Sequence, residues 1–113
     1  MIEVEGTKIS ITRGDAGPVR FTFTGDDVPE DGTDILFTVK KNSEYDKALI
    51  EKRVPVQGGQ MEIFFHNEDT RSLPFGNYEW DIRLPDYYGT KEPYTPMIAP
   101  QIFEVTRVVG NVK

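Results

Sequence analysis

Apolar and polar residues alternate along most of the chain, with the period of two that is typical of β-strands with one buried face. Proline and glycine residues separate the alternating runs, as expected for short strands joined by turns. The pattern predicts strands at Thr7–Thr12, Val19–Thr24, Ile35–Lys40, Ala48–Val54, Gln60–His66, Asn77–Leu84 and Gln101–Val109. The side chains expected to point inward from them include Phe21, Phe37, Ile63 and Trp80.

Two positions between the strands carry further information. Pro55 interrupts the fourth run, and because proline cannot donate to a strand ladder, that strand is expected at a sheet edge. Gly58-Gly59 is typical of a hairpin turn, which predicts that the strands before and after it pair antiparallel.

Two segments lose the alternation. Residues Asn67 to Leu73 are predicted to form a single helical turn or tight crossover, closed by Pro74 and Gly76. Residues Pro85 to Pro100 are predicted to form a long loop rich in proline and tyrosine.

The residue types favour an all-β fold, because Val, Ile and Thr far outnumber Ala and Leu. About seven short strands predict an immunoglobulin-like two-sheet antiparallel sandwich, with one short helical turn near residues 67–73. A small barrel is the competing closure. Gly76-x-Tyr78-x-Trp80 favours the sandwich, because it resembles a tyrosine corner, in which the phenol hydroxyl bonds back to the backbone a few residues upstream. At 113 residues, one domain spanning 1–113 is expected.

Composition excludes several classes of function. The chain has no cysteine, which excludes disulfides, thiolate metal sites and thiol nucleophiles. A net charge of −6 disfavours nucleic acid and anionic lipid as partners. The first residues carry acids where a signal peptide needs a basic start, and no apolar run is long enough to span a membrane. We therefore expect no signal peptide and no membrane insertion.

Candidate chemical motifs are weak. The single His66 lacks partners for a multi-histidine site, and the acids between Asp26 and Asp34 do not have the spacing of a calcium loop. Arg13-Gly14-Asp15 spells a cell-adhesion tripeptide, but it is also ordinary turn chemistry. The basic pairs Lys40-Lys41 and Lys52-Arg53 are interpreted as solvated faces. Because nothing marks a pair of catalytic carboxylates or any other catalytic signature, we expect no enzyme activity, no metal and no cofactor.

The most suggestive surface is the predicted loop at 85–100. Tyr87, Tyr88 and Tyr94 place amphipathic rings there, and such rings serve as anchors for protein or sugar contacts. The same rings could instead fold back and cap the core, so both interpretations stay open.

Several short segments of the chain carry a resemblance to known proteins: Ile11–Asp15, Ile35–Lys41, Glu68–Leu73, Gly76–Ile82 and Phe103–Thr106. In this succession they resemble small proteins encoded by phages and prophages of Gram-positive bacteria, and also the immunoglobulin-like N-terminal modules of tail and baseplate proteins. The resemblance implies a non-catalytic structural module of a virion or tail. Its implied partners are other phage tail or virion proteins, with a homo-oligomer also possible, and its implied location is the virion or the bacterial host cytoplasm during assembly.

Two hypotheses follow. In the first, the domain acts in protein–protein assembly, through its strand edges and the tyrosine-bearing loop. In the second, it is a glycan- or receptor-binding module that recognises its ligand through Tyr87, Tyr88 and Tyr94.

Overall fold

The computed structural model describes residues 1–24, 28–42, 47–85 and 94–107. Within them the chain forms strands and one short helix, and the all-β prediction is confirmed. The elements are β1 (Ile2–Glu5), β2 (Lys8–Thr12), β3 (Gly17–Thr22), β4 (Asp34–Lys40), β5 (Ile50–Pro55), β6 (Gln60–Phe65), α1 (Asn67–Arg71), β7 (Gly76–Pro85) and β8 (Tyr94–Thr106).

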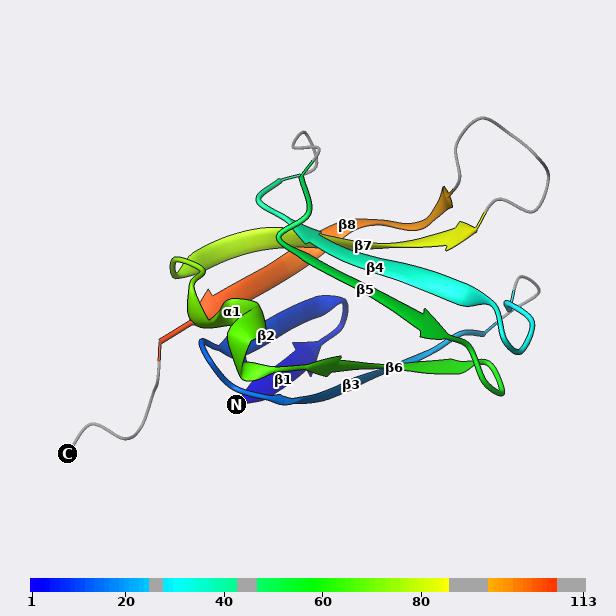
Figure 1. The fold of residues 1–113 in the computed structure, drawn as a ribbon, viewed down its shortest axis with the longest axis horizontal. Coiled ribbons are helices and arrows are strands. Elements are labelled where there is room, and N and C mark those ends of the chain that lie inside the picture. Colours follow the sequence, from blue (N-terminus) through cyan, green and yellow to red (C-terminus); the bar gives the residue numbers. More distant parts are fainter. Residues whose placement is uncertain (25–27, 43–46, 86–93, 108–113) are drawn as a thin grey trace.

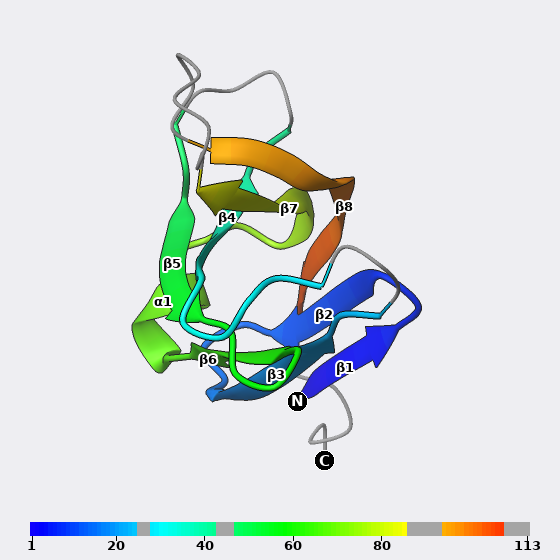
Figure 2. The same cartoon turned by 90° about the vertical axis from the view of Figure 1, so that its right-hand side faces the viewer.

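The strands form two sheets (Figure 1). The larger sheet has six strands in the order β1-β2-β8-β7-β4-β5, and the smaller consists of β3 and β6. Figure 2 shows that the larger sheet curls, so that β1 and β2 come to lie near β3. The predicted position of the fourth strand at an edge is confirmed, because β5 is the last strand of the larger sheet.

The prediction of purely antiparallel pairing is wrong at one place, where β2 and β8 run parallel. After β2 the chain turns at residues 13–16 and enters the smaller sheet as β3. One side of β2 is paired with β1, and its other side is therefore left for the last strand, which arrives from β7 in the parallel direction.

The predicted turn at Gly58-Gly59 is confirmed, because Gln57 and Gln60 form an antiparallel bridge across it, but the predicted pairing of the strands before and after it is wrong. Strand β5 pairs with β4 and strand β6 pairs with β3, so the two neighbours in sequence belong to different sheets. The physical reason is a pair of backbone bonds at Val56, whose N–H donates to Thr33 (2.9 Å) and whose carbonyl accepts from Gly32 (2.7 Å). These bonds hold the end of β5 against the segment before β4, and the glycine turn then carries the chain across to the other sheet.

One apolar core lies between the two sheets, and aromatic rings occupy its middle. Phe21 of the smaller sheet contacts Trp80 of the larger, with ring centroids 5.4 Å apart. Phe65 likewise lies 5.8 Å from Phe37 and 5.7 Å from Phe103. Side chains predicted to point inward do so: Phe37, Ile63 and Trp80 are buried, and Phe21 is half-buried against them.

The predicted helical turn is confirmed as α1, which starts directly after β6. The carboxylate of Asp69 accepts a hydrogen bond from the His66 backbone N–H at 2.8 Å, which satisfies a donor at the helix start. Only five residues are helical. The element connects β6 of the smaller sheet to β7 of the larger sheet, and is therefore a crossover between the sheets.

The predicted tyrosine corner is confirmed at the start of β7. The Tyr78 hydroxyl donates to the Pro74 carbonyl oxygen at 2.7 Å, and the side chain is buried. Two residues further, the Trp80 indole N–H donates to the Thr7 carbonyl oxygen at 2.9 Å. Both rings therefore fill the core without leaving their polar atoms unpaired.

Replacing Tyr78 by Phe should lower the free energy of unfolding by about 1 kcal/mol near neutral pH, since the Pro74 carbonyl loses its donor. Burial raises the pKa of the Tyr78 hydroxyl above its usual value of about 10. The unfolded chain therefore loses this proton first, and the contribution of Tyr78, complete below pH 10, is lost as the pH rises through the folded-state pKa.

Denaturant titrations of both proteins from about pH 8 to pH 11 test this linkage. The difference in the free energy of unfolding between wild type and Tyr78→Phe should be constant up to about pH 10 and shrink above it. A difference that stays constant across the whole range would contradict the assigned burial.

Candidate functional site

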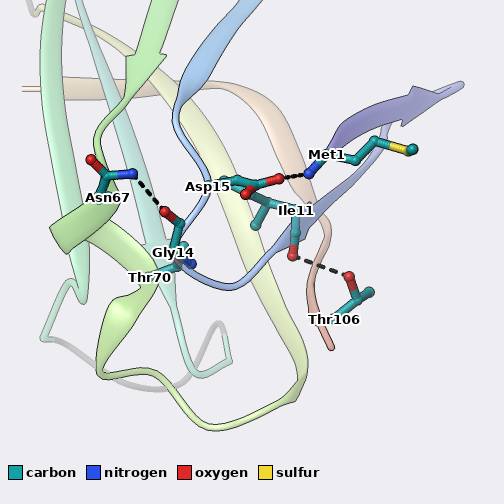
Figure 3. A network of polar contacts seen from close by, with 7 residues as sticks. All are labelled: Met1, Ile11, Gly14, Asp15, Asn67, Thr70 and Thr106. Carbon is teal, nitrogen blue, oxygen red and sulfur yellow. Dashed lines mark hydrogen bonds and ion pairs between the residues drawn. The ribbon is translucent and has the colours of Figure 1, made fainter. Parts of the chain in front are cut away.

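One end of the molecule is built by three elements that are distant in sequence: the turn between β2 and β3, the helix α1, and the bend before β7 (Figure 3). The Gly14 N–H donates to the Thr70 hydroxyl oxygen at 2.8 Å, and the Asn67 side-chain amide donates to the Gly14 carbonyl at 2.7 Å. Gly14 has φ of 85°, a left-handed conformation that favours glycine. The turn is therefore fixed to the helix through both backbone polar groups of Gly14.

The N-terminus and the end of β8 complete this arrangement. The Met1 ammonium group forms an ion pair with the Asp15 carboxylate. The Thr106 hydroxyl lies 3.4 Å from the Ile11 carbonyl, to which it donates. Each of these contacts involves a residue in, or shortly before, the turn between β2 and β3, as Figure 3 shows.

The Arg13-Gly14-Asp15 tripeptide belongs to this turn, and each of its residues is already engaged. The Arg13 guanidinium carbon lies 4.1 Å from the centre of the Phe75 ring, Gly14 bonds to α1, and Asp15 pairs with the N-terminus. These intramolecular contacts explain the tripeptide as a structural turn, which disfavours the adhesion interpretation.

Phe75 is the most distinctive side chain at this end. Its ring is 42% exposed although it is large and apolar. Besides Arg13, the Arg107 guanidinium carbon lies 5.1 Å from the ring centre, so two cations contact one aromatic ring. Such cation–π contacts contribute about 0.5–1 kcal/mol each at exposed sites, and they hold the ring in a defined position.

Phe75 also forms part of a surface groove, which we call the Phe75 groove. Its lining residues are Lys41, Lys47, Leu49, Leu73, Pro74, Phe75, Gly76, Asn77 and Tyr78. Leu73 and Tyr78 are buried and form its base. Leu49, which comes from a distant part of the sequence, is 41% exposed in the same lining. The groove is therefore mainly apolar.

The charged side chains among the described lining residues of the Phe75 groove are positive, opposite in sign to the net charge of the chain. Lys41 and Lys47 are exposed in its lining, and no acid is present among the described lining residues. Arg13 and Arg107 add two further positive charges over Phe75. In a chain of net charge −6, this combination is complementary to a ligand that presents carboxylates beside an apolar side chain.

The tyrosines predicted as binding residues are not brought together by the described structure. Tyr87 and Tyr88 lie outside the described residues, and of Tyr94 only the backbone is described, at the start of β8. The predicted loop over 85–100 is wrong for residues 94–100, which continue the β7–β8 ladder as far as Pro85 opposite Tyr94. The ladder accommodates proline because its register shifts after Trp80, and strands tolerate proline at such irregularities.

The other candidate residues have structural partners. His66 precedes α1, and its ring lies 5.0 Å from that of Phe64. In the acidic segment before β4, the Asp31 carboxylate accepts from the Gly58 N–H at 2.8 Å and so stabilises the glycine turn. No group of three His, Asp or Glu side chains within the described residues is arranged to hold a metal ion.

Sequence reasoning missed the Phe75 groove. A signal was present, because Phe75 is an aromatic residue placed between Pro74 and Gly76, in a bend where apolar side chains have no strand to bury them. The sequence predicts a solvated Lys40-Lys41 pair, and Lys41 is exposed, but its place beside Leu49 and Phe75 depends on the fold.

Comparisons with known proteins give no relative: no protein-family model, no curated protein and no solved structure matches the chain. In the part of the chain that the structure describes, no helix is long and apolar enough to cross a membrane.

Replacing the buried Thr70 by Val keeps its shape but removes the acceptor for the Gly14 N–H, and should cost about 1–3 kcal/mol of stability. Thr70→Ser keeps the hydroxyl and is the matched control. Hydrogen–deuterium exchange should show faster exchange at the Gly14 amide in Thr70→Val than in Thr70→Ser. Equal protection of that amide in both variants would mean that Thr70 does not hold the turn.

Proposed function

We propose that this chain is a non-catalytic structural module of a phage or prophage virion or tail, and that it acts by docking onto another protein. The sequence resemblance supplies the virion context. The observation that carries the docking role is the Phe75 groove, in which an exposed aromatic ring is held beside exposed Leu49 and Lys47.

The chemistry of the Phe75 groove supports protein as its ligand. Aromatic residues and arginine are enriched in the cores of protein interfaces, and they contribute much of the binding energy there. Phe75 is positioned by Arg13 and Arg107 before any partner arrives, so little side-chain entropy remains to be lost on binding.

We also propose that the two sheets form an immunoglobulin-like sandwich. Three features support this assignment: the parallel placement of β2 beside the last strand, the helical crossover before β7, and the bond from Tyr78 to Pro74. A tyrosine corner at this crossover is characteristic of such domains. In this fold the ends of the sandwich carry the loops that bind partners, and the Phe75 groove lies at one end.

The test is incorporation into virions. The chain would be expressed from its native locus, particles would be purified, and its copy number would be measured by quantitative mass spectrometry. Wild type should be present in a fixed ratio to the other particle proteins. Phe75→Ala should reduce incorporation about tenfold or more, as expected for a central interface residue.

Phe64→Ala is the matched control, because Phe64 is 45% exposed, close to the 42% of Phe75, but lies on the smaller sheet. It should be incorporated like wild type. Absence of the chain from the particles would contradict the virion role, and equal incorporation of all three proteins would contradict docking through the Phe75 groove.

A further inference from the structure

We infer that the Phe75 groove accepts the acidic loop of a second copy of this chain, so that copies associate head to tail. This inference rests on the proposed docking function and adds the identity of one partner. The acidic loop is defined here as the described residues 28–34, which lead into β4.

The acidic loop presents exposed carboxylates and one exposed apolar side chain. Glu30, Asp31 and Asp34 are all exposed, and the apolar Val28 is 37% exposed beside them. The groove presents Lys41 and Lys47 around an apolar surface. In the inferred contact, the loop of one copy places an apolar residue flanked by carboxylates against the groove of the other copy, which is apolar and flanked by ammonium groups. The two surfaces are therefore complementary in both polarity and charge.

The acidic loop is also held in one conformation by backbone bonds. The Thr33 N–H donates to the Glu30 carbonyl at 3.0 Å, and the Gly32 N–H donates to Val56 at 2.7 Å. Asp31 is used internally, because its carboxylate accepts from Gly58. In the described contacts Glu30 and Asp34 accept no such bond from the chain's own backbone, and in the inferred association they are the carboxylates that contact Lys47 of the groove.

The two surfaces lie at opposite ends of the molecule. Figure 1 shows the segment before β4 at one end of the long axis and the bend between α1 and β7 at the other. The chain measures 54 Å along that axis. A single copy therefore cannot bring its own loop into its own groove.

This separation decides the type of assembly. A contact between two different surfaces is heterologous, and each copy keeps one unused surface, so association continues into rings or open filaments and does not stop at a dimer. One loop in one groove is a small interface, so we expect weak association that requires high protein concentration. The contribution of the carboxylates and lysines should weaken as salt is raised.

Sedimentation velocity on the purified wild-type chain is the first test. The mean mass should rise with concentration past that of a dimer, and should fall when salt is raised from about 0.1 M to about 1 M, where the screening length shrinks from about 10 Å to about 3 Å. A monomer at every concentration would overturn the inference. If incorporation into virions still depended on Phe75, the proposed function would stand without it.

Two double variants then separate the surfaces. Lys47→Glu with Phe75→Ala removes the groove and leaves the acidic loop, whereas Glu30→Lys with Asp34→Lys removes the loop charges and leaves the groove. Each should be monomeric alone. Mixed, they should form a one-to-one complex that grows no further, since only one loop and one groove remain functional.

Recovery on mixing also shows that each variant is folded, because each must supply an intact surface. A control variant, Glu3→Lys with Glu51→Lys, makes the same change to the net charge as Glu30→Lys with Asp34→Lys, but at two exposed positions on β1 and β5. It should associate like wild type. Dissociation of this control, or a mixture of the two variants that stays monomeric, would overturn the head-to-tail assignment.

Discussion

Contacts between aromatic rings of the two sheets are the interaction on which the rest of this structure depends. Phe21 and Phe65 come from the smaller sheet, and they meet Phe37, Trp80 and Phe103 of the larger at centroid distances of 5.4 to 6.0 Å. Each such pair contributes about 0.5–1.5 kcal/mol beyond the apolar area it buries. The chain has no cysteine, so no disulfide assists these contacts. The smaller sheet has only two strands, and an isolated pair is at best marginally stable in water.

The same core fixes the Phe75 groove. Strand β7 places Tyr78 and Trp80 inward, and the hydroxyl of Tyr78 then fixes the preceding bend through Pro74. Phe75 follows directly after that anchored carbonyl, so its exposure is a consequence of the corner. On the other side, Arg13 reaches the ring from a turn that Thr70 holds against α1. An exposed aromatic ring is therefore positioned by buried groups on both sides, which is the rigidity that a docking surface needs.

Alternation along the sequence was sufficient to predict most strands, the inward side chains and the Tyr78 corner, because each depends on local spacing. Alternation does not determine which strands pair with one another. Strands β5 and β6 are separated by a glycine turn, yet backbone bonds at Val56 direct them to different sheets. The prolines in the first half of β8 are typical of a loop, so that part of the strand was not predicted. The position of the Phe75 ring depends on residues that only the fold brings together, such as Arg13 and Phe75.

The most direct measurement of the central claim is the set of nuclear Overhauser contacts among the aromatic rings in solution. The account predicts cross-peaks between Phe21 and Trp80 and between Phe65 and Phe103, because both pairs join the two sheets at 5.4 and 5.7 Å. Rings of β3 and β6 that show contacts only with each other, and none with Trp80 or Phe103, would contradict it.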